Sequence, residues 1–299
     1  MLNVLSLFSG IGAFEKALEN LNIDHEVVGY CEIDKYASKA YSAIHDISEE
    51  KNLNDVTKID ILDVEDTVDL ITYGFPCQDI SNAGKQRGFE HEGELTRSGL
   101  FFEALRIIED YKPKFAIAEN VKALVSKKFT KEFNIVLDSL DKAGYNNYWQ
   151  VLNAKDYGIP QNRERVFIIS IRKDIDKGFT FPESIPLELR LKDILQDEID
   201  EKYYLNDEQV SRLLGATFNQ DKARLQKTDV CNTLLARDYK GPKVIPIKEA
   251  TKAGYAEAVV GDSVNLEQPN SKTRRGRVGK QVAQTLTTSC NQGVVLNEN

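Results

Sequence analysis

Short apolar runs alternate with stretches of helical periodicity over the first half of the chain. Runs typical of strands lie at residues 4–8, 26–31, 68–73, 114–118, 147–152 and 165–171. Residues 13–21, 99–111 and 129–143 repeat apolar positions with the spacing of a helix. This alternation predicts an α/β fold, a doubly wound and mostly parallel sheet with helices on both faces.

The pattern changes after residue 171. Pro182 and Pro186 interrupt it, and the remainder of the chain is polar with short apolar runs. We therefore expect two domains, residues 1–178 and residues 179–299. The second should be smaller, irregular and rich in β-structure.

Composition narrows the class of protein only a little. The chain is 41% hydrophobic and 29% charged, as is ordinary for a globular protein, and no apolar run approaches the roughly 18 residues of a membrane span. The N-terminus lacks a basic leader and runs into a glycine turn, which indicates a first strand. Four cysteines without paired close spacing argue against a disulfide scaffold and against a metal site. We expect a cytoplasmic protein without membrane anchor or metal.

The net charge of −8 does not exclude a nucleic-acid partner, because it averages over surfaces that face different partners. Acidic side chains dominate residues 46–69, whereas residues 272–280, here called the basic window, contain five basic residues and no acid. The basic window is a candidate for contacts with phosphates or base edges. A solvated loop is the alternative.

A glycine turn joins the first predicted strand to the first predicted helix. Its sequence is Phe8-Ser9-Gly10-Ile11-Gly12, and backbone N–H groups at a helix start bind anionic groups. Glu32 follows the next strand, where nucleotide-binding sheets place the acid that accepts ribose hydroxyls. The third glycine of a dinucleotide fingerprint is absent, which argues against a dinucleotide, and a purely structural turn is the alternative.

A cysteine stands where a predicted strand gives way to a polar loop. The tripeptide Pro76-Cys77-Gln78 follows the apolar run at residues 68–73, and a thiol in that place can attack a substrate. A small buried side chain is the alternative. The loop at residues 79–98 carries three glycines as hinges and could close over a substrate.

Two further polar segments adjoin predicted strands. Glu119-Asn120-Val121 follows residues 114–118, so its carboxylate should emerge at the same sheet edge as Cys77. In residues 161–165 the alternation points Gln161, Arg163 and Arg165 to one side. A helix-capping acid and an edge-strand salt-bridge network are the respective alternatives.

In their order along the chain, these four segments resemble the cytosine-5 DNA methyltransferase family of bacterial or phage restriction–modification type. The resemblance implies S-adenosylmethionine as the cofactor, with Glu32 at its ribose and Asp55 at the adenine amino group. The positions that match the family's cofactor site are Phe8, Ser9, Gly10, Ile11, Gly12, Glu32, Ile33, Asp55, Val56 and Pro76.

The resemblance also implies covalent chemistry on a cytosine extruded from duplex DNA. Cys77 would add to C6 and make C5 reactive toward the methyl group. Glu119 would engage N3 and the exocyclic amine, which by proton donation would require a raised pKa. Arg165 would contact O2, and Arg163 would help to shape the site. The candidates for DNA contact are Ser81, Gln86, Arg87, Arg97, Arg274, Arg275 and Arg277.

The resemblance ends before the C-terminus. Family members follow the recognition domain with an Arg-Leu-Gln-Gly-Phe-Pro type helix and a Gly-Asn helix, and neither follows Lys280. We expect either that a second polypeptide supplies these elements or that the chain is truncated, and that it binds S-adenosylmethionine weakly alone. The functional alternatives are a noncatalytic DNA-binding subunit or degenerate remnant, and an RNA cytosine-5 methyltransferase.

Overall fold

The chain forms two compact units. The computed structural model describes residues 1–64, 66–77, 88–91, 94–194, 245–251, 254–267, 276–285 and 292–295. Unit 1 comprises Met1–Leu152 and Glu164–Glu183, and unit 2 comprises Asn153–Arg163 and Ser184–Asn299. The expected boundary after residue 178 differs from this division. Unit 2 also takes in Asn153–Arg163, because the short strand β8 (Gln161–Asn162) pairs with β14 (Ala283–Gln284).

A six-stranded sheet with the order β2-β1-β3-β6-β9-β7 lies at the centre of unit 1. Neighbours among the first four strands of this order pair in parallel. The strands are β1 (Leu2–Leu7), β2 (His25–Cys31), β3 (Leu70–Tyr73), β6 (Phe115–Val121), β7 (Tyr145–Asn153) and β9 (Glu164–Arg172). Each overlaps a strand expected from the sequence, and the predicted mostly parallel α/β fold is confirmed.

Strand β9 runs antiparallel to its neighbour β6. Val121 at the end of β6 pairs with Arg165 at the start of β9, and Phe115 pairs with Ile171. The first residues of β9 therefore lie at the edge of the sheet where β6 ends. The apolar pattern predicted this strand but not its direction, because a buried run looks the same in either orientation.

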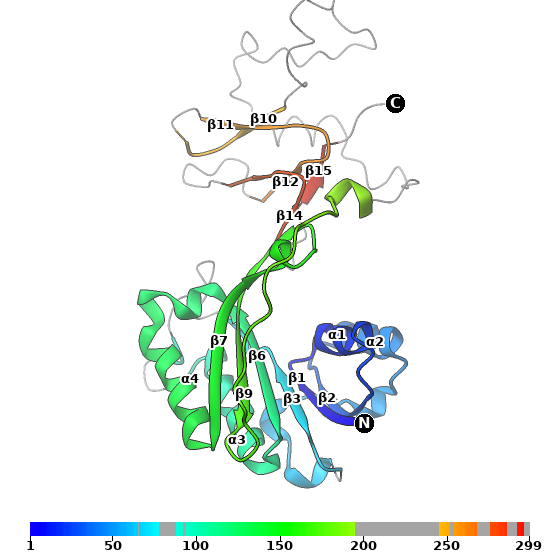
Figure 1. The fold of residues 1–299 in the computed structure, drawn as a ribbon, viewed down its shortest axis with the longest axis vertical. Coiled ribbons are helices and arrows are strands. Elements are labelled where there is room, and N and C mark those ends of the chain that lie inside the picture. The colour runs from blue at the N-terminus through cyan, green and yellow to red at the C-terminus, as the bar shows by residue number, and fades with distance from the viewer. Residues whose placement is uncertain are drawn as a thin grey trace, which may run out of the picture. The chain divides into compact units, whose positions relative to one another are not determined.

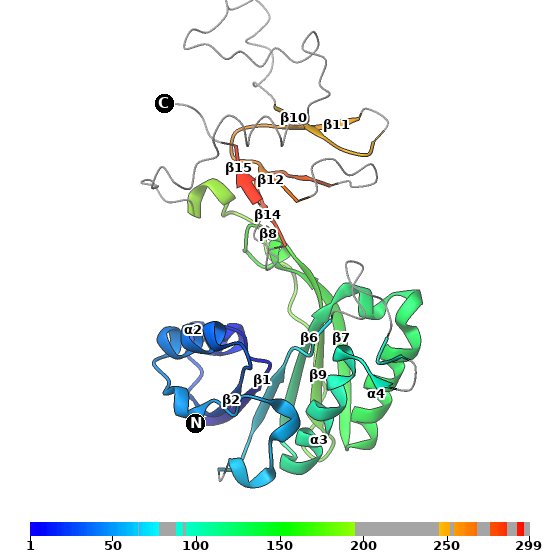
Figure 2. The same ribbon diagram turned by 180° about the vertical axis from the view of Figure 1, so that it is seen from behind.

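Helices cover the sheet on both sides (Figures 1 and 2), with α1 (Ala13–Asn20) and α2 (Lys35–His45) on one side and α3 (Phe101–Tyr111) and α4 (Thr130–Lys142) on the other. Ile107 of α3, Val136 of α4 and Ile71 of β3 belong to one large buried cluster. Tyr41 of α2 packs with Val27 and Tyr30 of β2 in a second cluster. The sheet is thus buried on both faces, as its nearly continuous apolar strands require.

Helix α2 was missed from the sequence. Its N-cap is Asp34, whose carboxylate accepts hydrogen bonds from the N–H groups of Tyr36 and Ala37, both at 2.9 Å. An aspartate at this position is a standard start signal, and buried Ser38 and Tyr41 follow at helical spacing. The helix could therefore have been predicted.

Short elements connect the main ones in unit 1. A two-stranded hairpin of β4 (Glu90–His91) and β5 (Glu94–Leu95) precedes α3. The 3-10 helices are η1 (Glu49–Lys51), η2 (Val56–Lys58), η3 (Ile61–Asp63), η4 (Arg97–Leu100), η5 (Lys122–Val125) and η6 (Lys127–Phe129).

The described residues of unit 2 form small sheets. Strand β10 (Ile245–Lys248) pairs with β11 (Tyr255–Ala258), and β12 (Ser263–Asn265) lies between β13 (Val278–Gly279) and β15 (Gln292–Val294). Two 3-10 helices, η7 (Ala154–Asp156) and η8 (Leu191–Ile194), lie in the part of unit 2 that the structure describes. Ile247, Ala258 and Val264 form a buried cluster of its own. In the described ranges of both units, none of the helices has the length and apolar character needed to cross a membrane.

Candidate active site

The glycine turn between β1 and α1 contacts helix α2 through His45. Gly12 is the N-cap of α1 at φ +83°, and a Cβ there would lie 2.1 Å from His45 Nε2. The His45 ring nitrogens lie 3.1 Å from the carbonyl oxygen of Ile11 and 2.7 Å from Glu19 Oε1. Hydrogen bonds from Lys16 and His45 lower the pKa of Glu19 to about 2. A side chain at position 12 would therefore require His45 or Tyr41 to move.

Glu32 follows β2 and faces this turn. Its carboxylate accepts hydrogen bonds from the N–H groups of Gly10 and Asp34, both at 2.8 Å. Asn52 brackets the Glu32 backbone, accepting from its N–H and donating to its carbonyl oxygen, both at 3.0 Å. Each carboxylate oxygen carries a second lone pair, so Glu32 can still accept hydroxyl groups from a ligand.

Asp55 caps the 3-10 helix η2 at the neighbouring loop. Its carboxylate accepts from Thr57 N at 3.1 Å and Thr57 Oγ1 at 2.9 Å, and it pairs with Lys58 at 3.4 Å. These contacts, led by the Thr57 hydroxyl, lower the pKa of Asp55. Val56 is buried, whereas Ile33 after Glu32 is 73% exposed. The elements expected to surround a cofactor thus meet at the ends of β1 and β2.

Cys77 lies in the turn that follows β3. Its side chain is half-buried and packs against the main core. Asn120, buried in β6, donates a hydrogen bond from Nδ2 to the Phe75 carbonyl oxygen at 3.0 Å. This contact ties the backbone beside Pro76 and Cys77 to the neighbouring strand. The Cys77 turn is therefore fixed by β6 as well as by β3.

Glu119 and Arg165 form an ion pair beside this turn. Arg165 Nε lies 3.0 Å from Glu119 Oε1, and both side chains are largely buried. A Cβ on Gly74 would lie 3.9 Å from Glu119 Oε2. Arg165 is paired with Val121, and Glu119 shares the face of Val121, so the two charges are diagonal neighbours on one face. The antiparallel direction of β9 brings this pair together.

Cys31 differs from Cys77 in its surroundings. It ends β2 and donates a hydrogen bond from Sγ to the Asn54 carbonyl oxygen at 2.9 Å. Burial, with smaller effects from Glu32 and Asp55, raises the pKa of the Cys31 thiol to about 12. A thiol so hard to ionise is a poor nucleophile.

Arg163 belongs to unit 2. Its backbone N–H donates to Asn153 Oδ1 at 3.0 Å and to the Gln161 carbonyl oxygen at 3.1 Å. Its role in the site stays a prediction. Arg97 begins η4 and is exposed. The other loop candidates Ser81, Gln86 and Arg87, and Arg274 and Arg275 of the basic window, lie outside the described residues.

Arg277 does not suit the expected DNA contact. Its side chain is 1% exposed, its Nε donates to the Asn265 carbonyl oxygen at 3.0 Å, and its N–H donates to buried Glu249. Lys280, at the end of the basic window, pairs with buried Asp262 at 2.9 Å. We correct the sequence-based expectation for Arg277, because part of the basic window is used to hold unit 2 together.

Three structural contributors were missed from the sequence: Asn52, Asn120 and His45. Asn120 was quoted as part of Glu119-Asn120-Val121 but given no task, and nothing nearby in sequence indicates its partner Phe75. Asn52 and His45 act on residues more than one element away. Such contacts leave no periodic or local signal in a single sequence.

An open, mostly parallel sheet with a glycine turn after the first strand and an acid after the second is the architecture of nucleotide-cofactor-binding α/β proteins. The comparison with known families is more specific. The profile of the family described as C-5 cytosine-specific DNA methylase matches residues 2–293. The chain therefore belongs to the C-5 cytosine-specific DNA methylase family.

Curated proteins that are similar to this chain are also named as methyltransferases. The orphan methyltransferase M.SPBetaI of Bacillus phage SPbeta is 33% identical over 99% of this chain and 84% of that protein. The type II methyltransferase M2.ScrFI of Lactococcus lactis subsp. cremoris is 39% identical over 71% of this chain and 72% of its own. The orphan methyltransferase M.SPRI of Bacillus phage SPR is 38% identical over 71% of this chain, which spans 54% of that relative.

Solved structures share the fold. The S. pombe Dnmt2 methyltransferase superposes with a TM-score of 0.52 at 25% identity, covering 68% of this chain and 63% of that one. A mutant of Spodoptera frugiperda DNMT2 superposes with a TM-score of 0.56 at 22% identity, covering 70% and 64%. The match covers about two thirds of each chain, and the methyltransferase fold expected from the sequence is confirmed.

Proposed function

We propose that this chain is a DNA (cytosine-5)-methyltransferase. It would transfer a methyl group from S-adenosylmethionine to C5 of a cytosine flipped out of a specific duplex sequence. The observation that carries the proposal is the Glu119–Arg165 ion pair beside the Cys77 turn. The chain's curated relatives are named as methyltransferases of type II systems and of phages. We propose the same setting for this chain, in the cytoplasm, where a nucleophilic thiol stays reduced.

Cytosine is a weak nucleophile at C5, so the ring must be activated. The Cys77 thiolate forms a bond from Sγ to C6, and the electron pair of the C5–C6 double bond becomes available at C5. When bound, S-adenosylmethionine would supply the methyl group to C5 from its sulfonium, with the S–CH3 bond breaking and the neutral thioether S-adenosylhomocysteine as the leaving group. Loss of the C5 proton to a solvent base then restores the double bond as the Sγ–C6 bond breaks. Cys77 leaves as the thiolate that began the reaction.

Glu119 and Arg165 recognise the cytosine ring. Arg165 carries five N–H donors in a planar fork, so it can donate to O2 while it stays paired with Glu119. Glu119 engages N3 and the exocyclic amine. Because Asn120 in the same strand holds the Phe75 carbonyl oxygen, ring binding and thiol attack share one rigid frame. Arg163 is proposed to shape this site.

The residues at the ends of β1 and β2 fit S-adenosylmethionine. Gly10 is at φ +57° with no atom within 4 Å of the place that a Cβ would take, so the backbone is open to a ligand. The turn from Phe8 to Gly12 would hold the methionine part, Glu32 the ribose hydroxyls and Asp55 the adenine amino group. Ile33, Val56 and Pro76 complete the proposed set. The spare lone pairs on Glu32 support the ribose assignment.

Duplex DNA is the proposed substrate. Unit 2 would read the sequence, with Arg274 and Arg275 as candidate contacts, and Arg97 would contribute from η4, which precedes α3. Phosphate contacts by such residues would make binding strongly salt-dependent. Arg277 is left out of this interface because it is buried.

The test is transfer of labelled methyl groups from S-adenosylmethionine to mixed-sequence duplex DNA by the purified chain. We expect label on cytosine C5 with the wild type, none with Cys77→Ala, and unchanged label with Cys290→Ala, which changes a cysteine outside the four segments that carry the family resemblance. Transfer by the chain alone would also show that no second polypeptide is needed. Label that persists in Cys77→Ala would overturn the assignment of the nucleophile.

A covalent trap tests the same step independently. In duplex DNA that carries 5-fluorocytosine, the fluorine on C5 cannot leave as a proton does, so the Sγ–C6 bond persists after methyl transfer. A denaturing gel should show a protein–DNA adduct that requires Cys77 and S-adenosylmethionine. A noncatalytic DNA-binding subunit would bind the duplex without forming this adduct. Competition by transfer RNA, if stronger than by duplex DNA, would instead favour the RNA methyltransferase.

A further inference from the structure

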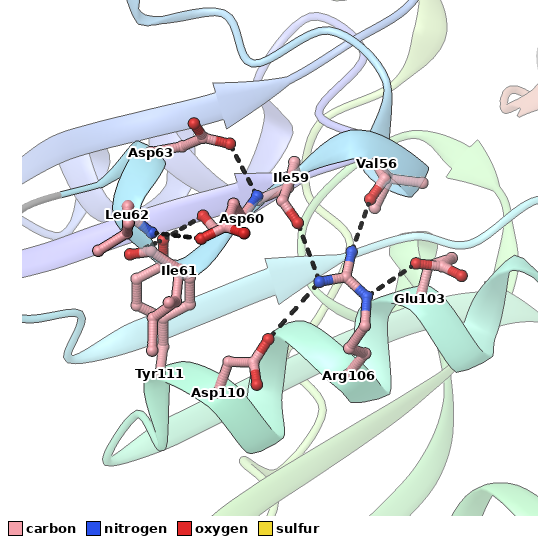
Figure 3. Close-up of polar contacts among 10 residues, drawn as sticks. All are labelled: Val56, Ile59, Asp60, Ile61, Leu62, Asp63, Glu103, Arg106, Asp110 and Tyr111. Atoms are coloured by element: carbon pink, nitrogen blue, oxygen red, sulfur yellow. Dashed lines mark hydrogen bonds and ion pairs between the residues drawn. The ribbon is translucent and has the colours of Figure 1, made fainter.

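Arg106 on helix α3 donates hydrogen bonds to the segment that directly follows Asp55, and Figure 3 shows its contacts with Val56 and Ile59. Its Nη1 donates to the Ile59 carbonyl oxygen at 2.9 Å, and its Nη2 donates to the Val56 carbonyl oxygen at 3.3 Å. Both acceptors lie about fifty residues earlier in the chain, at the start of η2 and just after its end. One guanidinium therefore fixes two peptide groups that closely follow Asp55.

Two acids on the same helix hold the guanidinium in place. Arg106 Nε lies 3.0 Å from Glu103 Oε2, and Nη1 lies 3.5 Å from Asp110 Oδ2. These acids are one turn before and one turn after Arg106, where side chains share a helix face. The planar fork of arginine serves the carboxylates and the carbonyl groups at once, whereas a lysine ammonium offers a single centre.

Tyr111 continues the same contact further along α3. Its hydroxyl lies 2.9 Å from the Ile61 carbonyl oxygen and 3.1 Å from that of Asp60. The two side chains thus secure the backbone from residue 56 to residue 61, a stretch whose regular structure is limited to the 3-10 helices η2 and η3. Short 3-10 helices order a chain only weakly, so the contacts from α3 add to the order of this segment.

The segment that α3 secures determines where the Asp55 carboxylate points. Asp55 caps η2 through Thr57, and the buried side chains of Val56 and Ile59 pack into the main core. Packing restrains where the segment lies, but apolar contacts do not fix the rotation of a peptide group. The two hydrogen bonds from Arg106 fix that rotation on the carbonyl side of η2.

We propose that Arg106 is a positioning residue for cofactor recognition, which sets the Asp55 carboxylate against the exocyclic amino group of adenine. This inference rests on the proposed function, because the adenine contact of Asp55 is part of it. Arg106 touches neither substrate nor cofactor. It acts through the backbone of η2, and its loss costs the site its preference for an amino group on the purine ring.

The test compares two ligands in calorimetric titrations of the full chain. One is S-adenosylmethionine, and the other is the analogue in which hydrogen replaces the adenine amino group. The wild type should prefer S-adenosylmethionine by about tenfold, the effect of one hydrogen bond to a charged group. Arg106→Leu should bind both ligands within about threefold of each other, and Arg106→Lys should fall between. The ratio of two dissociation constants does not depend on the fraction of protein that is folded.

Arg172 offers a matched control. Like Arg106, it donates hydrogen bonds to a carboxylate nearby in the sequence, that of Asp174 at 2.7 Å, and to a distant carbonyl oxygen, that of Lys112 at 2.7 Å. Unlike Arg106, it does not contact η2. Arg172→Leu should keep the tenfold preference. Tyr111→Phe, a milder change to the same segment, should reduce the preference by about twofold.

The outcomes separate the inference from the function on which it rests. A tenfold preference that survives in Arg106→Leu overturns the inference and leaves the proposed function standing. If the wild type binds both ligands equally, Asp55 does not contact the adenine amino group, and the inference is overturned. A wild type that binds neither ligand, and transfers no methyl group, overturns the proposed function for the chain acting alone, and the inference with it.

Discussion

Substituting Gly12 by alanine should damage the cofactor turn in a way that the structure defines closely. The added methyl group would lie 2.1 Å from His45 Nε2 and 2.9 Å from the Tyr41 ring. Neither side chain can move cheaply. His45 is 1% exposed and contacts the Ile11 carbonyl oxygen and Glu19, and Tyr41 is fully buried and stacked on its neighbour in β2.

The expected loss has two parts. An alanine at φ +83° carries about 1 kcal/mol of backbone strain relative to glycine. Displacing His45 breaks a contact to a carbonyl group and one to a carboxylate, for about 2 kcal/mol more. Together these lower the free energy of unfolding by about 3 kcal/mol. The melting temperature of unit 1 should fall by roughly 6–12 °C.

Urea unfolding followed by tryptophan fluorescence measures this loss. Trp149, the single tryptophan of the chain, lies in β7 and reports on unit 1. Gly178→Ala is the control, because Gly178 has φ +89° and open space where the methyl would go, so only the strain remains. In a His45→Ala background, Gly12→Ala should cost less than in the wild type, because only the backbone strain and the 2.9 Å approach to the Tyr41 ring remain. Equal losses for Gly12→Ala and Gly178→Ala would refute the reasoning.

Three further predictions follow from single contacts. Asn120→Ala frees the Phe75 carbonyl oxygen and should lower the methyl-transfer rate about tenfold with little change in DNA affinity, as single-turnover kinetics would show. Asn52→Ala removes both restraints on the Glu32 backbone and should weaken S-adenosylmethionine binding about tenfold in calorimetry, whereas unchanged affinity would exclude a supporting role. Burial opposes ionisation of Asp262, but the hydrogen bonds to its carboxylate outweigh burial and lower the pKa of Asp262 below the ordinary 3.8. The carboxylate therefore stabilises the fold above pH 3.8, and this stabilisation is lost as the pH falls further. Asp262→Asn should lower the stability of unit 2 by about 2 kcal/mol at pH 7 and by progressively less in acid, and a pH-independent loss in urea unfolding would contradict this.

The chain order of the apolar runs was enough to predict the class of fold. Parallel strands buried on both faces are apolar throughout, and they alternate with amphipathic helices, so the six strands of the central sheet stand out in the sequence. Helix α2 escaped notice although its start signal at Asp34 is present. The division between the units was harder to predict from the sequence, because the pairing of β8 with β14 joins residues more than a hundred positions apart.

The sequence also predicted candidates for the chemistry, since their segments hold unusual residues directly beside strands. Cys77, Glu119 and Arg165 were proposed in this way, and their chemical roles stay predictions. Their mutual arrangement was not predicted, because it depends on the direction of β9. Had β9 run parallel to β6, Arg165 would lie at the opposite edge of the sheet from Glu119.

By itself, then, the sequence determined the fold class, the family and the candidate reactive residues, because each is encoded locally by periodicity or by a short motif. Only the tertiary structure decided which side chains hold the site in shape. Asn52, Asn120 and Arg106 act on backbone groups of distant segments, and Arg277 is removed from the surface by burial. A hydrogen bond between a side chain and a remote carbonyl group depends on the position of the chain in space and not on the identity of the residue it reaches.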